Sequence, residues 1–151
     1  MIDTEFFDTD FLQSKSIKLV LHYIAPANPE KMYVPAYHFY ICDLYGRRIG
    51  ECDLRIGHND RLYYGGNIGY TIYKQFRGHH YAGKACKLLF KLAKKHELGY
   101  VIITCNPENK ASYRTAKYAG CRYLGTVEIP SDNDMRIDSG ETHKCIFKYN
   151  L

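Results

Sequence analysis

The most informative stretch of this 151-residue chain is residues 75–85, which read QFRGHHYAGKA. It is rich in small residues and separates a short apolar run from a longer segment with helical periodicity. A turn of this kind exposes backbone N–H groups, and the helix that follows leaves its first N–H groups unpaired and adds a positive partial charge. The stretch therefore predicts a binding site for phosphate or pyrophosphate.

Particular side chains in the turn suit that role. Gly78, Ala82 and Gly83 would let a ligand approach the backbone closely, and Arg77 and Lys84 would supply positive charge. Two other phosphate-binding patterns, G-x-x-x-x-G-K-[ST] and G-x-G-x-x-G, are absent. A glycine-containing turn that binds nothing is the alternative that local composition leaves open.

The segments on either side of the turn predict a strand–helix–strand unit. Apolar residues recur at helical spacing across 82–98, with Gly99 as a C-terminal stop. The continuously apolar run 100–105 is typical of a strand covered on both faces. With a further strand expected at 67–73, the two strands should be parallel.

The remaining segments complete a mixed sheet with helices packed on it, in a single domain spanning residues 1–151. We expect further strands at 17–24, 37–44, 50–56, 123–129 and 144–149, and a second helix at about 109–119. The first dozen residues could form a short helix or an arm. The polar, acidic segment 131–143 is expected to be a loop.

Composition narrows the class of protein. A net charge of +5 favours an anionic ligand, although an ordinary basic protein is an equal alternative. The 46% apolar and 25% charged residues are typical of a globular domain. None of the six cysteines forms a C-x-x-C pair, which excludes zinc-ribbon and thioredoxin-type sites. No leader or long apolar run is present, so we expect a cytoplasmic protein with reduced thiols.

Two segments resemble the GNAT family of N-acetyltransferases, in particular the branch that modifies ribosomal protein N-termini. Residues 69–72 followed by 77–82 are similar to a motif written [QR]-x-x-G-x-[GA]. Residues 106–112 followed by 120–125 are similar to N-x-x-S…G-[FY]-x-x-x-G. The resemblance implies an α/β (α+β) acyl-CoA N-acyltransferase fold, with a centrally splayed sheet of about seven strands and helices on both faces.

The resemblance also implies acetyl-CoA as co-substrate, with no metal. Its pyrophosphate would lie on the turn, its pantetheine arm would follow strand 67–73, and Asn109 would hold the pantetheine or position the acceptor. The implied cofactor-binding residues are Thr71, Ile72, Tyr73, Arg77, Gly78, His79, His80, Tyr81, Ala82, Gly83, Lys84 and Asn109. The lysine stripe of the helix is either a solvated face or a source of contacts to the 3′-phosphate, from Lys84 or Lys87.

The turn departs from the motif at His80, where glycine is expected. The imidazole must turn away from the cofactor, or the turn must shift. The pair His79-His80 could also suggest a metal, but adjacent histidines without a supporting Cys/Asp cluster rarely chelate one.

Direct transfer to an amine needs a base, donors for the oxyanion and an acid for the thiolate. The tyrosine that many relatives use as the acid is replaced by Ala116, so Ser112 is the candidate, with Tyr118 and Tyr113 as fallbacks. A small helix residue that makes room for the cofactor is the alternative role of Ser112.

The base is sought on or just after the third strand. Relatives often carry a glutamate where this chain has Asn67, which leaves Glu51, Asp53 and His58, or a water relay. Tyr70 is expected to line the acceptor cleft. The short connection 25–35 predicts a cleft that is open or covered by the N-terminal arm or a partner subunit, and the acidic loop could reach it.

The resulting hypothesis is an enzyme that transfers an acetyl group to a primary amine, on a peptide N-terminus or a small molecule, as a monomer or homodimer. A non-catalytic acyl-CoA sensor is the main alternative. A basic RNA-binding module is disfavoured because no aromatic RNP-like strand or concentrated basic patch is present, so no nucleic-acid partner is expected. No membrane partner is expected either.

Overall fold

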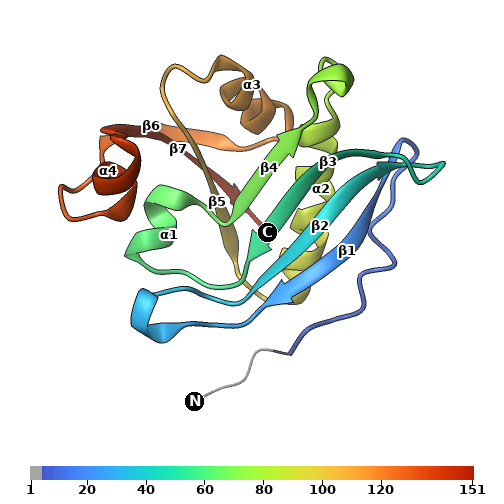
Figure 1. Cartoon of the computed structure of the whole chain (residues 1–151), viewed down its shortest axis with the longest axis horizontal. Helices are drawn as coiled ribbons and strands as arrows, with labels where there is room; N and C mark the ends of the chain where they lie inside the picture. The colour runs from blue at the N-terminus through green and yellow to red at the C-terminus, as the bar shows by residue number, and fades with distance from the viewer. Residues whose placement is uncertain (1–4) are drawn as a thin grey trace.

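The computed structural model describes residues 5–151, and within them seven strands form two antiparallel sheets (Figure 1). The first sheet has the order β1-β2-β3-β4 and the second the order β5-β7-β6. The strands are β1 (Ile17–Ala25), β2 (Ala36–Asp43), β3 (Arg48–Arg55), β4 (Ile68–Ile72), β5 (Tyr100–Cys105), β6 (Arg122–Glu128) and β7 (His143–Asn150). The expected acyl-CoA N-acyltransferase fold with its central splay is confirmed.

The splay lies between β4 and β5, which are side by side but belong to different sheets. The parallel pairing expected for these two strands is therefore not a hydrogen-bonded ladder. They meet at Asn67, whose N–H donates to Ile102 O at 2.7 Å and whose side-chain Oδ1 accepts from Ile102 N–H at 2.9 Å. Beyond this point the strand edges separate, which opens a space between the sheets.

Asn67 is fully buried and every polar atom of its side chain is satisfied. Its Nδ2 donates to Arg55 O at 3.0 Å and to Gly57 O at 2.8 Å, so one amide ties β3, β4 and β5 together. Sequence reasoning noted only that a glutamate was missing here. The amide can donate and accept in these directions, which a carboxylate cannot do.

Replacing Asn67 with leucine should lower the free energy of unfolding by about 3 kcal/mol or more, because it orphans buried polar groups on both sheets. Removing the N-cap of a surface helix, Asn133→Ala, should cost only about 1 kcal/mol. Urea denaturation of the two variants measures this difference. Equal, small losses for both would show that Asn67 does not hold the splay together.

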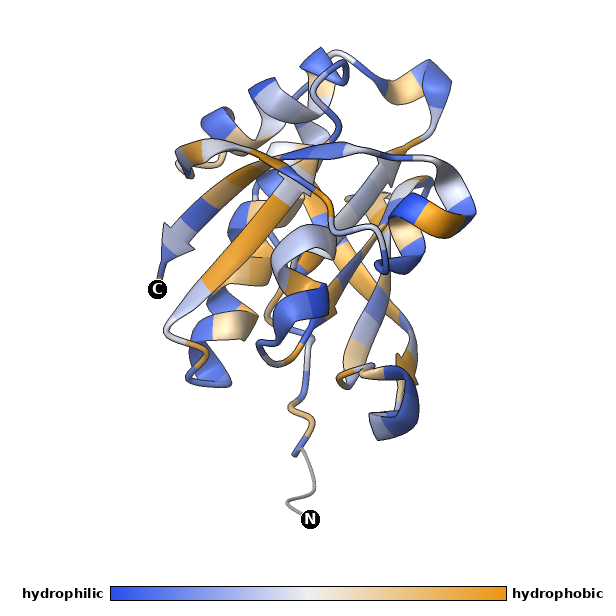
Figure 2. Ribbon diagram, turned by 90° about the vertical axis from the view of Figure 1, so that its left-hand side faces the viewer, coloured by the Kyte–Doolittle hydropathy of each residue, from blue (hydrophilic) through white to orange (hydrophobic). Residues whose placement is uncertain are grey.

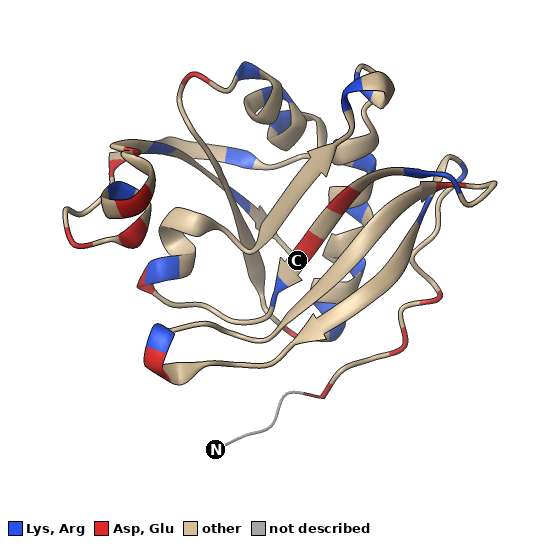
Figure 3. Cartoon of the chain, in the orientation of Figure 1, with Lys and Arg blue, Asp and Glu red and all other residues tan. Residues whose placement is uncertain are grey.

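The helices are α1 (Asp60–Gly65), α2 (Tyr81–Lys95), α3 (Lys110–Tyr118) and α4 (Asp134–Ser139), with 3-10 turns η1 (Pro29–Lys31) and η2 (Lys74–Phe76). Helix α2 lies behind the first sheet in Figure 1 and contacts strands of both sheets. Its apolar face enters the core, whereas its lysines lie on the opposite face (Figures 2 and 3). The expected acidic loop contains the short helix α4, which is capped by Asn133.

Residues 5–15 form an extended arm with no helix, and residues 1–4 of the expected arm or helix lie outside the described range. Residues 5–15 pack on Tyr37 and the end of α2 and do not line the acceptor cleft, which leaves an open cleft or a partner subunit as the alternatives. Phe7 N–H donates to Tyr37 Oη at 2.8 Å, and Tyr37 Oη lies 2.7 Å from His96 Nε2. Phe7 also packs edge-on against the His96 ring.

Stability should fall as the pH drops below about 6.5, the ordinary pKa of histidine. Burial lowers the pKa of His96, with Glu5 opposing, so the folded state binds fewer protons than the unfolded state in this range. The loss of stability continues until the pH has fallen below the pKa of His96 in the folded protein. Burial lowers the pKa of His38 as well, which acts in the same direction.

Thermal melts of wild type and His96→Gln from pH 8 to pH 5 measure this effect. Glutamine keeps an acceptor for Tyr37 but does not titrate, so the variant should lose less stability on acidification. Identical pH dependence in the two proteins would contradict the assignment.

Within residues 5–151, no helix combines the length and apolar character needed to cross a bilayer. All six cysteines lie at buried positions and are unpaired.

Candidate active site

The turn between β4 and α2 presents a row of unpaired main-chain donors. Gly78 has φ of 94° and His80 has φ of 60°, so the chain bends sharply before the helix. Within the described part of the chain, no backbone N–H from 78 to 83 donates to another protein group; the first such donor is Lys84, to His80 O at 3.0 Å. The first turn of α2 also carries no acidic residue. This arrangement suits an anion.

His80 occupies the position where the motif has glycine, and it keeps the backbone shape that glycine favours. Its left-handed conformation is uncommon for a residue with a side chain, although histidine adopts it more often than most. Its imidazole stacks on Tyr118 of α3, with ring centroids 4.3 Å apart and planes 4° from parallel. The His80 ring is therefore held against α3.

Tyr118 is the last residue of α3, and its ring packs against the first turns of α2. A Cβ on Gly83 would come within 2.3 Å of the Tyr118 ring, so glycine is required there for the two helices to approach. Lys87 Nζ lies 4.7 Å from the centre of the same ring. Tyr118 thus serves as packing surface beside the turn, which argues against its expected role as fallback acid.

A cavity of about 510 Å³ runs from the turn along β4 and beneath α3. We call it the cofactor cavity. Its lining comprises Tyr70, Thr71, Ile72, Phe76, Arg77, Gly78, His80, Tyr81, Ala82, Asn109, Ala111, Ser112, Arg114 and Thr115. The structure therefore brings together most of the residues that sequence reasoning assigned to the cofactor.

Four assigned residues, Tyr73, His79, Gly83 and Lys84, lie outside the lining of this cavity. Tyr73 N–H donates to Ile49 O at 3.0 Å and Tyr73 O accepts from Phe76 N–H at 2.9 Å, so Tyr73 has no main-chain N–H left for pantetheine. Lys84 Nζ lies 3.3 Å from Ser16 Oγ, outside the lining of the cavity. Lys87 also lies outside the lining, beside the stacked rings of His80 and Tyr118.

The outer edge of β4 faces the splay. In an antiparallel pair the main-chain groups point alternately toward and away from the partner strand. Because Tyr73 bonds to β3, the alternation points the main-chain groups of Thr71 toward β3 and those of Ile72 and Tyr70 toward the splay. Arg77 Nε donates to Ile72 O at 3.0 Å, so the Arg77 side chain folds back along this edge.

Tyr70 and Ser112 form a hydroxyl pair at the end of the cofactor cavity. Tyr70 Oη lies 2.9 Å from Ser112 Oγ, and Asn109 Oδ1 accepts from Ser112 N–H at 3.0 Å. Burial raises the pKa of Tyr70, so its hydroxyl stays protonated and can donate. Sequence reasoning placed Tyr70 in the acceptor cleft but missed this partner, which lies 42 positions along the chain.

A second cavity of about 450 Å³ lies on the first sheet, and we call it the acceptor cleft. It is lined by His22, Tyr23, His38, Phe39, Glu51, Cys52, Asp53, Gly69, Tyr70 and Thr71. Tyr70 and Thr71 line both the acceptor cleft and the cofactor cavity, so the two spaces meet at β4.

The acidic candidates in the cleft differ in what they contact. Asp53 Oδ1 accepts from Gly69 N–H at 2.8 Å, and its Oδ2 lies 3.4 Å from Arg55 and 3.8 Å from His38 Nδ1. Asp53 is therefore occupied with internal partners. Glu51 is exposed on β3 and forms no ion pair with a described residue.

His58 is not in the cleft, which corrects its place among the base candidates. It stacks on Tyr100 at 4.0 Å, and its Nε2 lies 3.0 Å from Leu98 O. His38 is one of the titratable residues of the cleft that sequence reasoning missed. Its ring stacks on Tyr23 at 4.2 Å, and alternation along 37–44 was the only signal that could have placed it on the open face.

No group of three or more His, Cys, Asp or Glu side chains suited to a metal is found among residues 5–151. His79 and His80 point to different neighbours, Tyr81 and Tyr118.

A splayed pair of sheets, with an unpaired N–H row between β4 and a long helix, defines the acyl-CoA N-acyltransferase class of folds. The chain belongs to the GNAT acetyltransferase family: the family model described as "Acetyltransferase (GNAT) domain" matches residues 8–122. No curated protein sequence matches the chain significantly.

Solved structures share the fold. A GNAT-family acetyltransferase from Bacillus anthracis is 20% identical, with a TM-score of 0.60 over 75% of this chain and 65% of that one. The microcin C7 self-immunity acetyltransferase MccE, in complex with acetyl-CoA and AMP, is 19% identical, with a TM-score of 0.60 over 77% and 61%. A ribosomal-protein-S5-alanine acetyltransferase from Vibrio fischeri is 14% identical, with a TM-score of 0.57 over 76% and 61%. The chain thus spans less than two thirds of each relative's length.

Proposed function

We propose that this protein transfers an acetyl group from acetyl-CoA to a primary amine. The observation that carries the proposal is the meeting of two cavities at β4. One leads from the unpaired N–H row to Tyr70, and the other leads from the carboxylates of β3 to the same residue. Family membership supports the choice of acetyl-CoA as the occupant of the first cavity.

The residues of the cofactor cavity fit an acyl-CoA. The N–H groups of 78–83 would bind the diphosphate, and Lys87 would contact the 3′-phosphate. The main chain of Ile72 would pair with pantetheine once the Arg77 side chain moves aside. Acetyl-CoA supplies an activated thioester, and the main-chain N–H of Tyr70 or Ile72 would stabilise the oxyanion.

The reaction exchanges one bond for another. The amine nitrogen bonds to the acetyl carbon, the carbon–sulfur bond breaks, and the electron pair leaves on sulfur. Glu51 accepts the proton that the amine loses, directly or through water, because it is the exposed carboxylate of the cleft and forms no ion pair with a described residue. Ser112 donates a proton to the departing thiolate while its oxygen accepts a hydrogen bond from the protonated Tyr70 hydroxyl, and a proton from solvent then restores Ser112.

Glutamine at position 51 keeps the size of the side chain but cannot accept the proton. Glu51→Gln should lower kcat by about 100-fold, the lower end of the range for general base catalysis, with the KM for acetyl-CoA unchanged. Steady-state assays of thiol release measure kcat and the KM for acetyl-CoA. A kcat within threefold of wild type would remove Glu51 from the mechanism.

Thiol release from acetyl-CoA across a panel of amines tests the proposal as a whole. We expect release that depends on the amine and is matched by an acetylated product. Binding of acetyl-CoA without turnover of any amine would favour the sensor alternative, which the replacement of the usual tyrosine by Ala116 keeps open.

A further inference from the structure

Three cavities follow one another along the face that carries the acceptor cleft. The cleft shares His38 with a second cavity of about 430 Å³, which we call the apolar cavity. The apolar cavity shares Met32, Arg61 and Asp134 with a third, the distal cavity, of about 610 Å³. The three cavities therefore adjoin one another at shared side chains, from the meeting point at β4 to α4.

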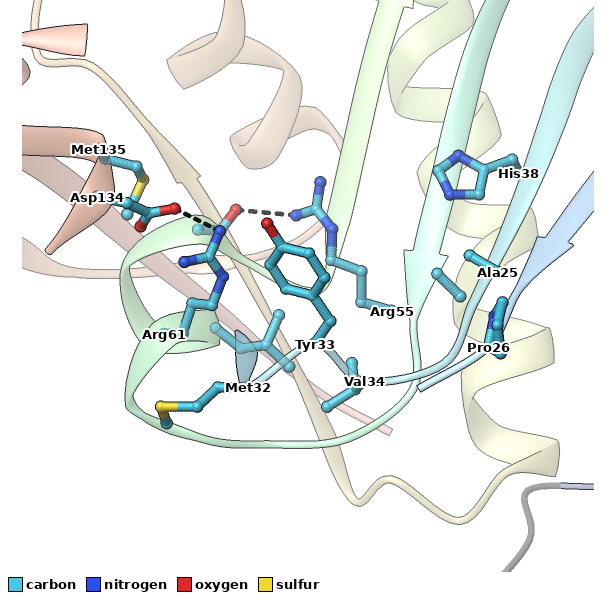
Figure 4. A pocket seen from close by; sticks show the side chains of 13 residues that line it. Ala25, Pro26, Met32, Tyr33, Val34, His38, Arg55, Arg61, Asp134 and Met135 are labelled. Carbon is cyan, nitrogen blue, oxygen red and sulfur yellow. Dashed lines mark hydrogen bonds and ion pairs between the residues drawn. The ribbon is translucent and has the colours of Figure 1, made fainter. Parts of the chain in front are cut away.

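The apolar cavity lies between the end of β1 on one side and α1 with α4 on the other (Figure 4). The connection between β1 and β2, residues 26–35, forms one wall, so the short connection noted in the sequence shapes this space. Much of its lining is aliphatic or thioether: Ala25, Pro26, Met32, Val34, Ala36, Leu62 and Met135. Methionine side chains adapt readily to ligands of different shape.

The charged residues of this cavity are already paired. Arg61 lies 2.5 Å from Asp134 and its guanidinium is 4.7 Å from the centre of the Tyr33 ring. Arg55 donates to Gly65 O at 3.2 Å and to Gly66 O at 2.8 Å (Figure 4). With both carbonyl and carboxylate partners in place, the cavity offers an apolar surface rather than a free charge.

Charge also distinguishes the acceptor classes. The cleft supplies carboxylates for one ammonium group, whereas in the adjoining apolar cavity the carboxylate of Asp134 is already paired with Arg61. A polyamine or an aminoglycoside would place further cations where this cavity has no free counter-charge, which is unfavourable. A neutral peptide chain with an apolar side chain needs no counter-charge there.

We propose that the acceptor is the N-terminus of a polypeptide with a large apolar side chain at its first or second position. The α-amine would lie in the acceptor cleft, the apolar side chain in the apolar cavity, and later residues toward the distal cavity. This inference rests on the proposed function and specifies the substrate of that site.

A comparison of several acceptors, each assayed separately, tests the inference. Short peptides that carry leucine at position one or two are compared with an all-glycine peptide, glycinamide, spermidine and kanamycin, with thiol release as the readout. A leucine peptide should exceed the all-glycine peptide by about tenfold in kcat/KM, as expected for burial of one such side chain. Equal values, or a preference for spermidine or kanamycin, would overturn the inference.

Two variants on α4 locate the effect. Met135→Glu places a carboxylate in the apolar cavity and should remove most of the leucine preference while leaving glycinamide turnover unchanged. Ile137→Glu makes the same change on the same helix at a side chain that is 67% exposed and outside the cavity, and should keep the preference. A leucine preference that survives in Met135→Glu would contradict the assignment.

Glycinamide turnover without any leucine preference defeats this inference alone, whereas no turnover of any amine defeats the proposed function.

Discussion

Replacing Gly78 with glutamate should weaken acetyl-CoA binding by at least about 100-fold, because juxtaposed like charges cost several kcal/mol. The new carboxylate would stand in the N–H row where the diphosphate is proposed to bind. A Cβ at this position meets no heavy atom within 4 Å, so the side chain has room in the folded protein. Isothermal titration with acetyl-CoA measures the change.

The control for Gly78→Glu must strain the backbone in the same way but place its carboxylate away from the N–H row. Gly46 has φ of 87°, close to the 94° of Gly78, and its Cβ would also meet nothing within 4 Å. Gly46→Glu in the β2–β3 hairpin should therefore lose similar stability and keep normal binding. Gly78→Ala should bind far better than Gly78→Glu. Undiminished affinity in Gly78→Glu would place the diphosphate elsewhere.

Removing the Ser112 hydroxyl should lower kcat by roughly 100-fold, within the range for general acid catalysis, while the affinity for acetyl-CoA stays within a few fold. The reason is that Ser112 would protonate the thiolate only as the thioester breaks. Steady-state kinetics of Ser112→Ala, paired with titration of the same variant, separate the two effects. Tyr70→Phe should fall in the same direction, because it removes the hydroxyl that lies 2.9 Å from Ser112 Oγ.

Thr115 supplies the matched control for Ser112. It lines the same cavity one helical turn later, but its hydroxyl donates to Ala111 O at 3.0 Å. Thr115→Ala should therefore leave kcat nearly unchanged. If Ser112→Ala raised the KM for acetyl-CoA and left kcat intact, Ser112 would only make room for the cofactor.

The parts of the site that were predictable from sequence are those made by neighbouring residues. The turn at 75–85 combines small residues with a helix start, and both signals lie within a few positions of each other. The same holds for α2 and β5, whose periodicity and apolar run are local patterns. His80 fits this pattern because its backbone conformation, rather than its side chain, completes the turn.

The parts that were not predictable depend on contacts between distant segments. Asn67 reaches Ile102, 35 positions away, and Tyr70 reaches Ser112, 42 positions away. His38 enters the cleft because its strand lies beside β3, opposite Asp53 in the register. Sequence patterns of one chain indicate which face a residue occupies, but the partner across the sheet depends on strand order and register.

The same reasoning explains why His58, Lys84 and Tyr73 lie outside the linings of the cofactor cavity and the acceptor cleft. Each lies near the expected site in the sequence, but each is held by a group elsewhere: Leu98 O, Ser16 Oγ and Ile49 O, respectively. Proximity along the chain was a poor guide because each of these groups contacts a partner outside the expected site.

The most direct test of the account follows the amide N–H signals of the turn by ¹⁵N–¹H NMR while coenzyme A is added. We predict that the signals from 78 to 83 show the largest shifts in the molecule. Saturable binding of coenzyme A with these six amides unmoved would contradict the account.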